Sequence, residues 1–301
     1  MMVMKMGFML CNADKAVFIK YDCDEHLIIG ISTDNSLITG MPKLVTWFRT
    51  KIMKYYKITN LRDMKFLLGF HVKCDQEACT ISLNMKTYAE SIMEKYNIDK
   101  KPTYLPMHPG TILLMSQSPS TDEEKEYMKK LPYQSLFRAL WYAATVCSPE
   151  IVFPLSMCAQ YTENPRMDHY QALHQIAQYL YTNRELWLTF GGQKGGLVGY
   201  TDADWASQAH HHSTSGYLFH IGGGAISWSS KKQLIIALSS CELEYTGQTQ
   251  AAHENVWLHS LISEISPKPI AHPTPLNLDN QGVVTLSKSG SYHTHTKHID
   301  I

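Results

Sequence analysis

The order of strand and helix patterns after the glycine-rich joint at 191–196 constrains the fold of this chain more than any other feature. The patterns are strands at 197–206, 215–223 and 225–233, a helix at 241–265 and a short strand at 276–280. The strand patterns are rich in β-branched and aromatic residues, and the helical one is long. Three strands, a helix and a fourth strand predict a mixed sheet with the helix packed across it.

The residues before the joint predict two further regions. Residues 16–40 and 64–84 are each typical of a β-hairpin. Helical spacing of apolar residues follows each hairpin, at 42–56 and 86–98. The order ββαββα predicts an α+β arrangement, and a proline-rich linker then leads into mainly helical patterns. We therefore expect an α/β protein with domains at 1–110, 111–195 and 196–301.

Charge and cysteine content limit the classes of protein to which the chain can belong. Lys+Arg and Asp+Glu both number 27, which argues against a dedicated nucleic-acid-binding protein without excluding local basic patches. The seven cysteines include no CxxC pair, so we expect reduced cysteines in a cytoplasmic or nuclear protein. Lys5 interrupts the apolar N-terminal stretch, so we expect no signal peptide and no membrane span.

Three acidic residues occupy positions where the predicted sheet and helix can meet. Asp202 lies in the first strand of the C-terminal region, Glu244 near the start of the long helix and Asp279 at the end of the fourth strand. If these two strands are neighbours, the three carboxylates converge and repel one another unless cations neutralise them. That is the requirement of a two-metal Mg²⁺ site. The alternative is structural, because Asp forms turns and Glu interacts with helix dipoles.

Several blocks of sequence carry a family resemblance. They are "LVGYTDADWA", "STSGYLFHIGGGAISWSSKKQ", "ALSSCELEYTG", "LDNQG" and "HTHTKHIDI". In this order they resemble the ribonuclease H domain of copia-type LTR retrotransposon Pol polyproteins. Upstream, "GFMLCNADKAVFIKYD" and "TISLNMKTYAESIMEKY" are similar to the palm of the reverse transcriptase and the region after it, and 133–180 is similar to its connecting segment.

The resemblance implies a ribonuclease-H-like sheet and Mg²⁺-dependent hydrolysis of the RNA in an RNA–DNA hybrid. Asp202 matches the family's Y-S-D-A-D-W block, Glu244 its S-S-T-E-A-E-Y block and Asp279 its D-N-Q block. All three are implied catalytic residues and Mg²⁺ ligands, with Asp204 and Glu242 as second choices. The run "SSKK" at 229–232 could contact the backbone of the hybrid.

The chain also departs from the family. The Y-V-D-D turn of the polymerase aligns with Ser32–Asn35, where Asp34 keeps the first metal-binding acid and Asn35 replaces the second. We also expect the upstream palm strand and the last ribonuclease H strand to be missing, and DNA synthesis to be lost. Residues 196–301 contain five lysines, no arginine and eight acidic residues, and this net charge of −3 weakens binding to a polyanion.

Two functions therefore compete. The chain is either a ribonuclease-H-type endoribonuclease or a catalytically inactive retroelement remnant that binds at most nucleic acid or another protein. The three retained acids favour the enzyme, whereas Asn35 and the acidic balance favour the remnant. Two groups of histidines could bind Zn²⁺ or Ni²⁺, although surface positions are the simpler interpretation: His210, His211, His212, His293, His295 and His298. The sequence does not predict an oligomeric state.

Overall fold

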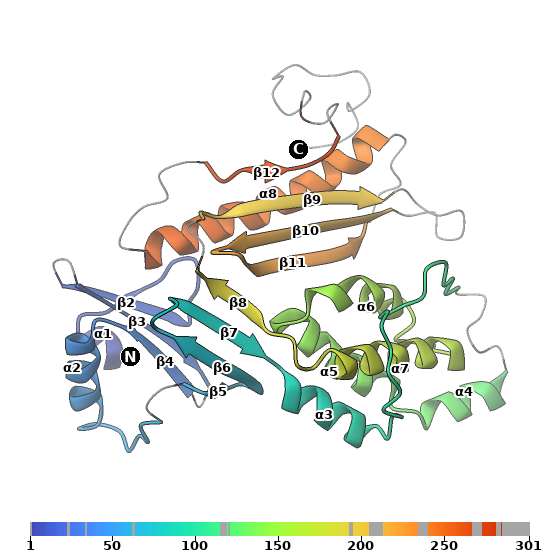
Figure 1. Cartoon of the computed structure of the whole chain (residues 1–301), viewed down its shortest axis with the longest axis horizontal. Coiled ribbons are helices and arrows are strands. Elements are labelled where there is room, and N and C mark those ends of the chain that lie inside the picture. The colour runs from blue at the N-terminus through green and yellow to red at the C-terminus, as the bar shows by residue number, and fades with distance from the viewer. Residues whose placement is uncertain are drawn as a thin grey trace. The chain divides into compact units, whose positions relative to one another are not determined.

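The structure of the chain is a computed structural model. It describes residues 2–22, 25–33, 35–61, 64–114, 119, 121–192, 195–204, 213–233, 240–266, 273–280 and 284. The fold is α/β, as the sequence predicts, and it divides into two compact units (Figure 1). Unit 1 comprises Met1–Asp63 and Ala252–Thr274, and unit 2 comprises Met64–Ala251 and Pro275–Ile301. Across the described ranges, every helix is too short or too polar to span a lipid bilayer.

Unit 1 is built on a four-stranded antiparallel sheet in the order β1-β2-β3-β4. Its elements are α1 (Met2–Lys5), β1 (Met9–Leu10), β2 (Val17–Asp22), β3 (Glu25–Ser32), β4 (Asn35–Gly40) and α2 (Pro42–Ile52). Leu27 and Ile29 on β3 are fully buried against Leu44 and Phe48 of α2. The helix begins at Pro42, whose fixed φ suits the first helical turn.

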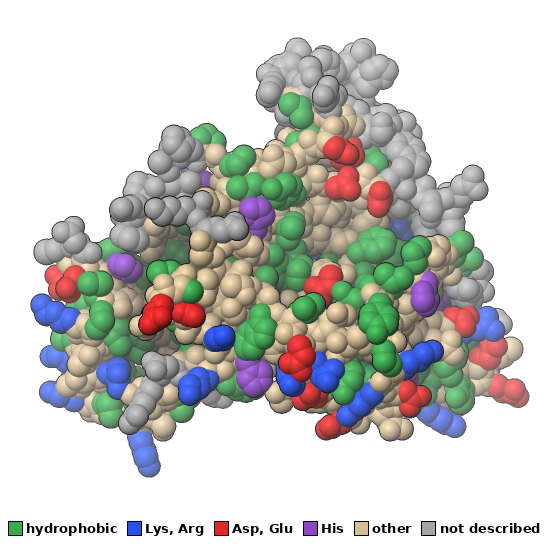
Figure 2. All heavy atoms as spheres, in the orientation of Figure 1, with side chains coloured by type: hydrophobic (Ala, Val, Ile, Leu, Met, Phe, Trp, Pro, Cys, Tyr) green, Lys and Arg blue, Asp and Glu red, His purple; other side chains and the backbone are tan. Residues whose placement is uncertain are grey.

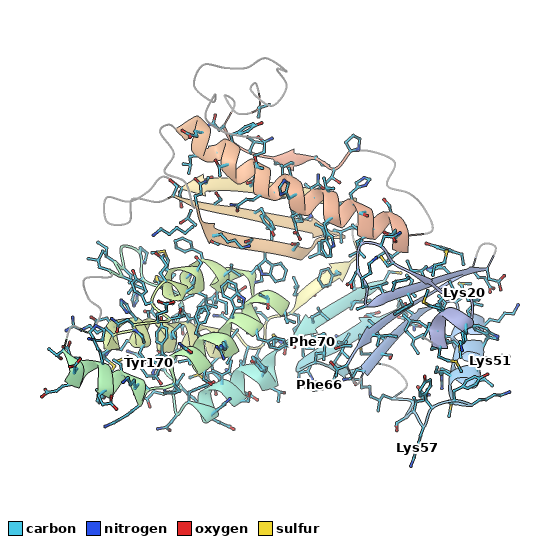
Figure 3. All side chains as sticks on the ribbon, turned by 180° about the vertical axis from the view of Figure 1, so that it is seen from behind. Lys20, Lys51, Lys57, Phe66, Phe70 and Tyr170 are labelled. Atoms are coloured by element: carbon cyan, nitrogen blue, oxygen red, sulfur yellow. The ribbon has the colours of Figure 1, made fainter. Side chains whose placement is uncertain are left out.

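Part of the last long helix, α8 (Ser240–Ile265), also belongs to unit 1. The Trp257 indole donates to the Ala13 carbonyl at 3.0 Å, and the Glu264 carboxylate accepts the Asn12 N–H at 2.7 Å. On β2, the Lys20 ammonium, labelled in Figure 3, lies 5.4 Å from the centroid of the Trp47 ring. The hairpin predicted at 16–40 did not include a third strand, β4. Most of the residues of β4 are exposed, so its sequence gives only a weak strand pattern.

Unit 2 contains an antiparallel sheet in the order β5-β6-β7-β8 and a layer of helices. The strands are β5 (Phe66–Leu67), β6 (Phe70–Asp75), β7 (Thr80–Asn84) and β8 (Leu188–Gly191). The helices are α3 (Lys86–Lys95), α4 (Asp122–Lys129), α5 (Tyr133–Val146), the short 3₁₀ helix η2 (Pro149–Ile151), α6 (Val152–Ala159) and α7 (Met167–Thr182). β8 lies at the end of the region that was expected to be mainly helical. It pairs with β7, where Leu188 lies opposite Leu83 and Phe190 opposite Ile81.

The second sheet of unit 2 has the order β11-β10-β9-β12 (Figure 1). Its strands are β9 (Val198–Asp204), β10 (Thr214–Ile221), β11 (Gly224–Lys232) and β12 (Leu276–Asn277). β9, β10 and β11 form an antiparallel meander, and β12 joins β9 in parallel. This is the mixed sheet that the order of sequence patterns predicts.

The helical layer holds the largest core of unit 2. Leu140 of α5, Leu155 of α6 and Leu173 of α7 are fully buried in it, and Tyr170, labelled in Figure 3, also lies within this core. Trp228 of β11 packs against the same core, and its indole donates to the Ala144 carbonyl at 2.8 Å. The second sheet is thereby fixed to the helices along its β11 edge, which leaves β9 and β12 at the other side.

Candidate metal centre

Asp202 owes its position to the alternation of β9. Thr201 and Ala203 are buried on one face of the strand, so Tyr200, Asp202 and Asp204 point to the other face, where they are exposed. The Asp202 carboxylate accepts the Ala203 N–H at 2.9 Å, which restricts its rotation. A rigid strand therefore presents this carboxylate to the surface in a defined direction.

Asp279 reaches the same place through the parallel pairing of β12 with β9. Leu276 lies opposite Gly199, and Asn277 opposite Tyr200. The same offset, continued two residues beyond the ladder, puts Asp279 level with Asp202. The Asn277 side chain strengthens this register by donating to the Gly199 carbonyl at 3.2 Å.

Glu244 comes from α8, which crosses the buried face of β9 and β10. The approach is close because position 247 has no side chain. A Cβ at Gly247 would lie 3.3 Å from Ser215 Oγ and 3.4 Å from Ala203 Cβ. Glu244 precedes Gly247 by about one helical turn, near the N-terminal end of α8, and its carboxylate lies close to those of Asp202 and Asp279.

Gln233, which the sequence analysis did not select, attaches the start of α8 to the sheet. It follows β11 directly and is 2% exposed. Its side-chain amide donates to Ser215 Oγ at 2.5 Å and to the Leu243 carbonyl at 2.9 Å. A buried amide with these two bonds orients the residue that precedes Glu244. No sequence periodicity could have found it, because its partners come from two other segments.

The structure brings Asp202, Glu244 and Asp279 together. One carboxylate oxygen from each lies within 4.8 Å of the others, and among the described residues this is the group that could hold a metal ion. Figure 2 displays acidic side chains gathered near the ends of β9 and β12, with apolar side chains beside them. The second choices, Asp204 and Glu242, are not members of this group. Asp204 lies one exposed position further along β9, and Glu242 is 3% exposed, two residues from Glu244 and on another side of the helix.

The pKa of Glu244 reflects how close the three carboxylates lie to one another. Partial burial, together with the nearby carboxylates of Asp202, Asp279 and Asp204, raises the pKa of Glu244 to about 7. Among the residues that the structure describes, no cationic side chain lowers this pKa. Three hard oxygen ligands that repel one another fit Mg²⁺, or a chemically similar divalent ion such as Mn²⁺.

Glu244 also gives a stability prediction. An acid whose pKa is raised by folding binds a proton more tightly in the folded state, so stability falls as pH rises from about 4.5 toward 7. We expect Glu244→Gln in EDTA to be about 1 kcal/mol more stable than the unmodified chain at pH 8, a value reduced for solvent screening, and nearly equal to it at pH 4.5. Thermal unfolding of the full chain at both pH values measures this difference.

With Mg²⁺ present at pH 8, we expect the unmodified chain to be more stable than Glu244→Gln. Mg²⁺ stabilises the unmodified chain by binding the folded state, and Glu244→Gln should gain less from it. Glu163→Gln, a change at an exposed glutamate outside the group, is the matched control and should follow the unmodified chain throughout. Equal stabilisation of Glu244→Gln and the unmodified chain by Mg²⁺ would contradict a metal site that uses Glu244.

Several other predicted site residues fall outside the described residues. These are Asp34 and the histidines at 210–212, 293, 295 and 298. Asn35 is the first residue of β4 and pairs with Ser32. Of the two lysines in the run 229–232, Lys231 is exposed, whereas Lys232 donates to the Gln160 side chain at 3.0 Å.

Comparison with known proteins finds a family match in the N-terminal part of the chain. A family described as reverse transcriptase (RNA-dependent DNA polymerase) matches residues 1–109. No solved structure matches the chain.

Curated relatives extend the match along the chain. The retrovirus-related Pol polyprotein from transposon TNT 1-94 of Nicotiana tabacum is 32% identical over 293 residues, covering 96% of this chain and 22% of that protein. The corresponding polyprotein from transposon RE1 of Arabidopsis thaliana is 27% identical over 304 residues, covering 99% and 20%. The chain thus spans about a fifth of the length of these relatives. Secreted RxLR effector protein 161 of Plasmopara viticola is 42% identical over 135 residues, covering 44% of this chain and 94% of that protein.

Proposed function

Because this chain belongs to the Pol polyproteins of copia-type retrotransposons, with a reverse transcriptase region in its first 109 residues, we propose that its C-terminal part hydrolyses RNA in RNA–DNA hybrids. The proposed catalytic residues are Asp202, Glu244 and Asp279, acting with Mg²⁺. We propose three domains: the palm region at 1–110, the helical connection at 111–195 and the ribonuclease-H-like domain at 196–301.

A single observation carries the proposal. Carboxylate oxygens of three residues from two strands and one helix lie within 4.8 Å of one another. Such a group is unfavourable without cations, as the raised pKa of Glu244 indicates. When bound, Mg²⁺ would activate water and stabilise the leaving oxygen of a phosphodiester.

The chain's own residues contribute position and charge. β9 and β12 hold Asp202 and Asp279 side by side through their parallel register, and the backbone N–H of Ala203 orients Asp202. Glu244 must lose its proton to act as a ligand, and this favours activity at neutral and alkaline pH. The Gln233 amide holds the start of α8 in place through its hydrogen bond to the Leu243 carbonyl.

DNA synthesis by this chain is not part of the proposal. Asn35 stands where the family's turn has its second acid, and an amide oxygen carries no net charge with which to hold a divalent ion.

The test is cleavage of a short hybrid with labelled RNA by the full chain. We expect cleavage of the RNA in the hybrid that requires Mg²⁺ and is abolished by EDTA, with RNA duplex and DNA duplex of the same sequence left intact. Asp279→Asn, purified in parallel, controls for ribonucleases of the expression host. Binding of the hybrid without Mg²⁺-dependent cleavage would favour the alternative, an inactive module that only binds nucleic acid. Equal cleavage by Asp279→Asn and the unmodified chain would refute the enzymatic proposal.

A further inference from the structure

A shallow pocket adjoins the carboxylates on the exposed face of the second sheet of unit 2. It has a volume of about 460 Å³. The residues that line it include Tyr200, Asp202, Gly216, Leu218, Asn277 and Asp279. The two carboxylates account for part of this pocket, and the proposed hydrolysis assigns no role to the rest.

The floor of the pocket is formed where β9 and β10 pair. Gly216 lies opposite Asp202, and Leu218 lies opposite Tyr200, so all four positions share one face of the sheet. Gly216 leaves the floor open because it has no side chain. A Cβ added there would lie 3.5 Å from its nearest neighbour, the Ser229 carbonyl oxygen. The pocket therefore has a flat apolar floor next to its charged end.

Tyr200 forms an aromatic wall of this pocket. It is 44% exposed, and its ring is stacked on His220 with centroids 5.4 Å apart and planes inclined by 28°. The Tyr200 hydroxyl and His220 Nε2 are 3.5 Å apart. An exposed ring with a fixed orientation is ready to contact a flat ligand, because little side-chain entropy remains to be lost on binding.

We propose that this pocket binds one nucleotide of the RNA strand next to the cleaved phosphate, with its ribose and base edge packed against the Tyr200 ring. The inference rests on the proposed function and adds a substrate-positioning residue to it. A nucleotide has a charged phosphate at one end and a flat, largely apolar body at the other. The pocket has the matching order, since its metal-binding carboxylates lie at one end and Tyr200, Leu218 and the Gly216 floor lie beyond them.

Packing of a ribose and base edge on an aromatic ring tolerates sequence variation, because every nucleotide of the RNA strand carries the same ribose. Such a subsite would suit an enzyme that cleaves hybrids of many sequences. The ring, rather than the hydroxyl, makes the contact, so Phe should replace Tyr200 and Ala should not.

Hybrid binding by the full chain tests the inference. We would measure fluorescence anisotropy of a labelled hybrid with Ca²⁺ in place of Mg²⁺, since Ca²⁺ takes the same oxygen ligands with looser geometry. We expect Tyr200→Ala to weaken binding about tenfold or more, and Tyr200→Phe to stay within about twofold of the unmodified chain. In Mg²⁺, the loss in Tyr200→Ala should appear in KM, with kcat changed by less than about threefold.

Two further variants make the result specific. Tyr200→Leu keeps an apolar side chain but removes the ring, and should behave as Tyr200→Ala does. Tyr127→Ala removes a tyrosine that is 55% exposed on α4, outside this pocket, and should bind as the unmodified chain does. Unchanged binding by both Tyr200→Ala and Tyr200→Leu would overturn the inference and leave the proposed hydrolysis intact. Failure of the unmodified chain to bind any hybrid would overturn both.

Discussion

Replacing Asp202 by Asn is expected to lower Mg²⁺-dependent cleavage of an RNA–DNA hybrid by more than about 100-fold. Loss of residues that merely support metal ligands costs about 10–100-fold, and Asp202 is itself one of the proposed ligands. The change keeps the size of the side chain and its acceptor for the Ala203 N–H, while it removes the negative charge. Initial rates at saturating Mg²⁺, and their dependence on Mg²⁺ concentration, measure the effect.

Asp204→Asn is the matched control. Asp204 lies on the same strand and the same exposed face, and the substitution removes the same charge. It is not one of the three residues whose carboxylates lie within 4.8 Å of one another. We expect it to reduce the rate by less than about tenfold, through the weaker local potential alone. Losses of the same size in both variants would mean that overall charge, rather than ligation, explains the role of Asp202.

Phe219→Ala is expected to destabilise unit 2 by about 3–5 kcal/mol and to impair the metal centre as well. Phe219 of β10 is fully buried. Its ring fills the space above Gly199, where an added Cβ would lie 2.4 Å from Phe219 Cε1 and 2.9 Å from Leu276 Cδ1. Removing the ring leaves a cavity beneath the contact between β9 and β12, so the position of Asp279 should loosen. Urea unfolding of the full chain gives the free energy.

Leu218→Ala provides the comparison on the opposite face of the same strand. Leu218 is only partly buried, so its truncation should cost less than half as much as that of Phe219. Cleavage assays of Phe219→Ala below its unfolding midpoint separate the loss of stability from the effect on the metal centre. If Phe219→Ala were fully active while destabilised, the ring would support the fold without fixing Asp279.

Much of the C-terminal arrangement follows from the sequence because local patterns and connectivity agree there. The alternation around Asp202 assigns it to the exposed face of β9, and the helix predicted at 241–265 corresponds to α8 (Ser240–Ile265). The short pattern at 276–280 yields β12, which pairs with β9 in parallel, so the first and fourth strands of the pattern are neighbours. The convergence of Asp202, Glu244 and Asp279 was therefore predictable, whereas their catalytic role stays a prediction.

Other features depend on partners distant in sequence. β8 was missed because its strand character comes from pairing with β7, about a hundred residues earlier. Gln233 was missed because its two hydrogen bonds go to β10 and α8. The pocket beside Tyr200 arises only when Gly216 and Leu218 come opposite β9. In each case the determining contact is between segments, and no single segment carries a pattern for it.

Because β12 is short, we expect this molecule to lose activity on heating before its fold unfolds. Only two residues of β12 pair with β9, so we expect the segment that carries Asp279 to detach without disturbing the meander or the helical core. Amide hydrogens of such a segment exchange through sub-global opening well before the rest of the unit. Catalytic competence would then vanish on mild heating while spectroscopic signals of the fold persist, and a bound duplex that clamps this strand would delay the loss.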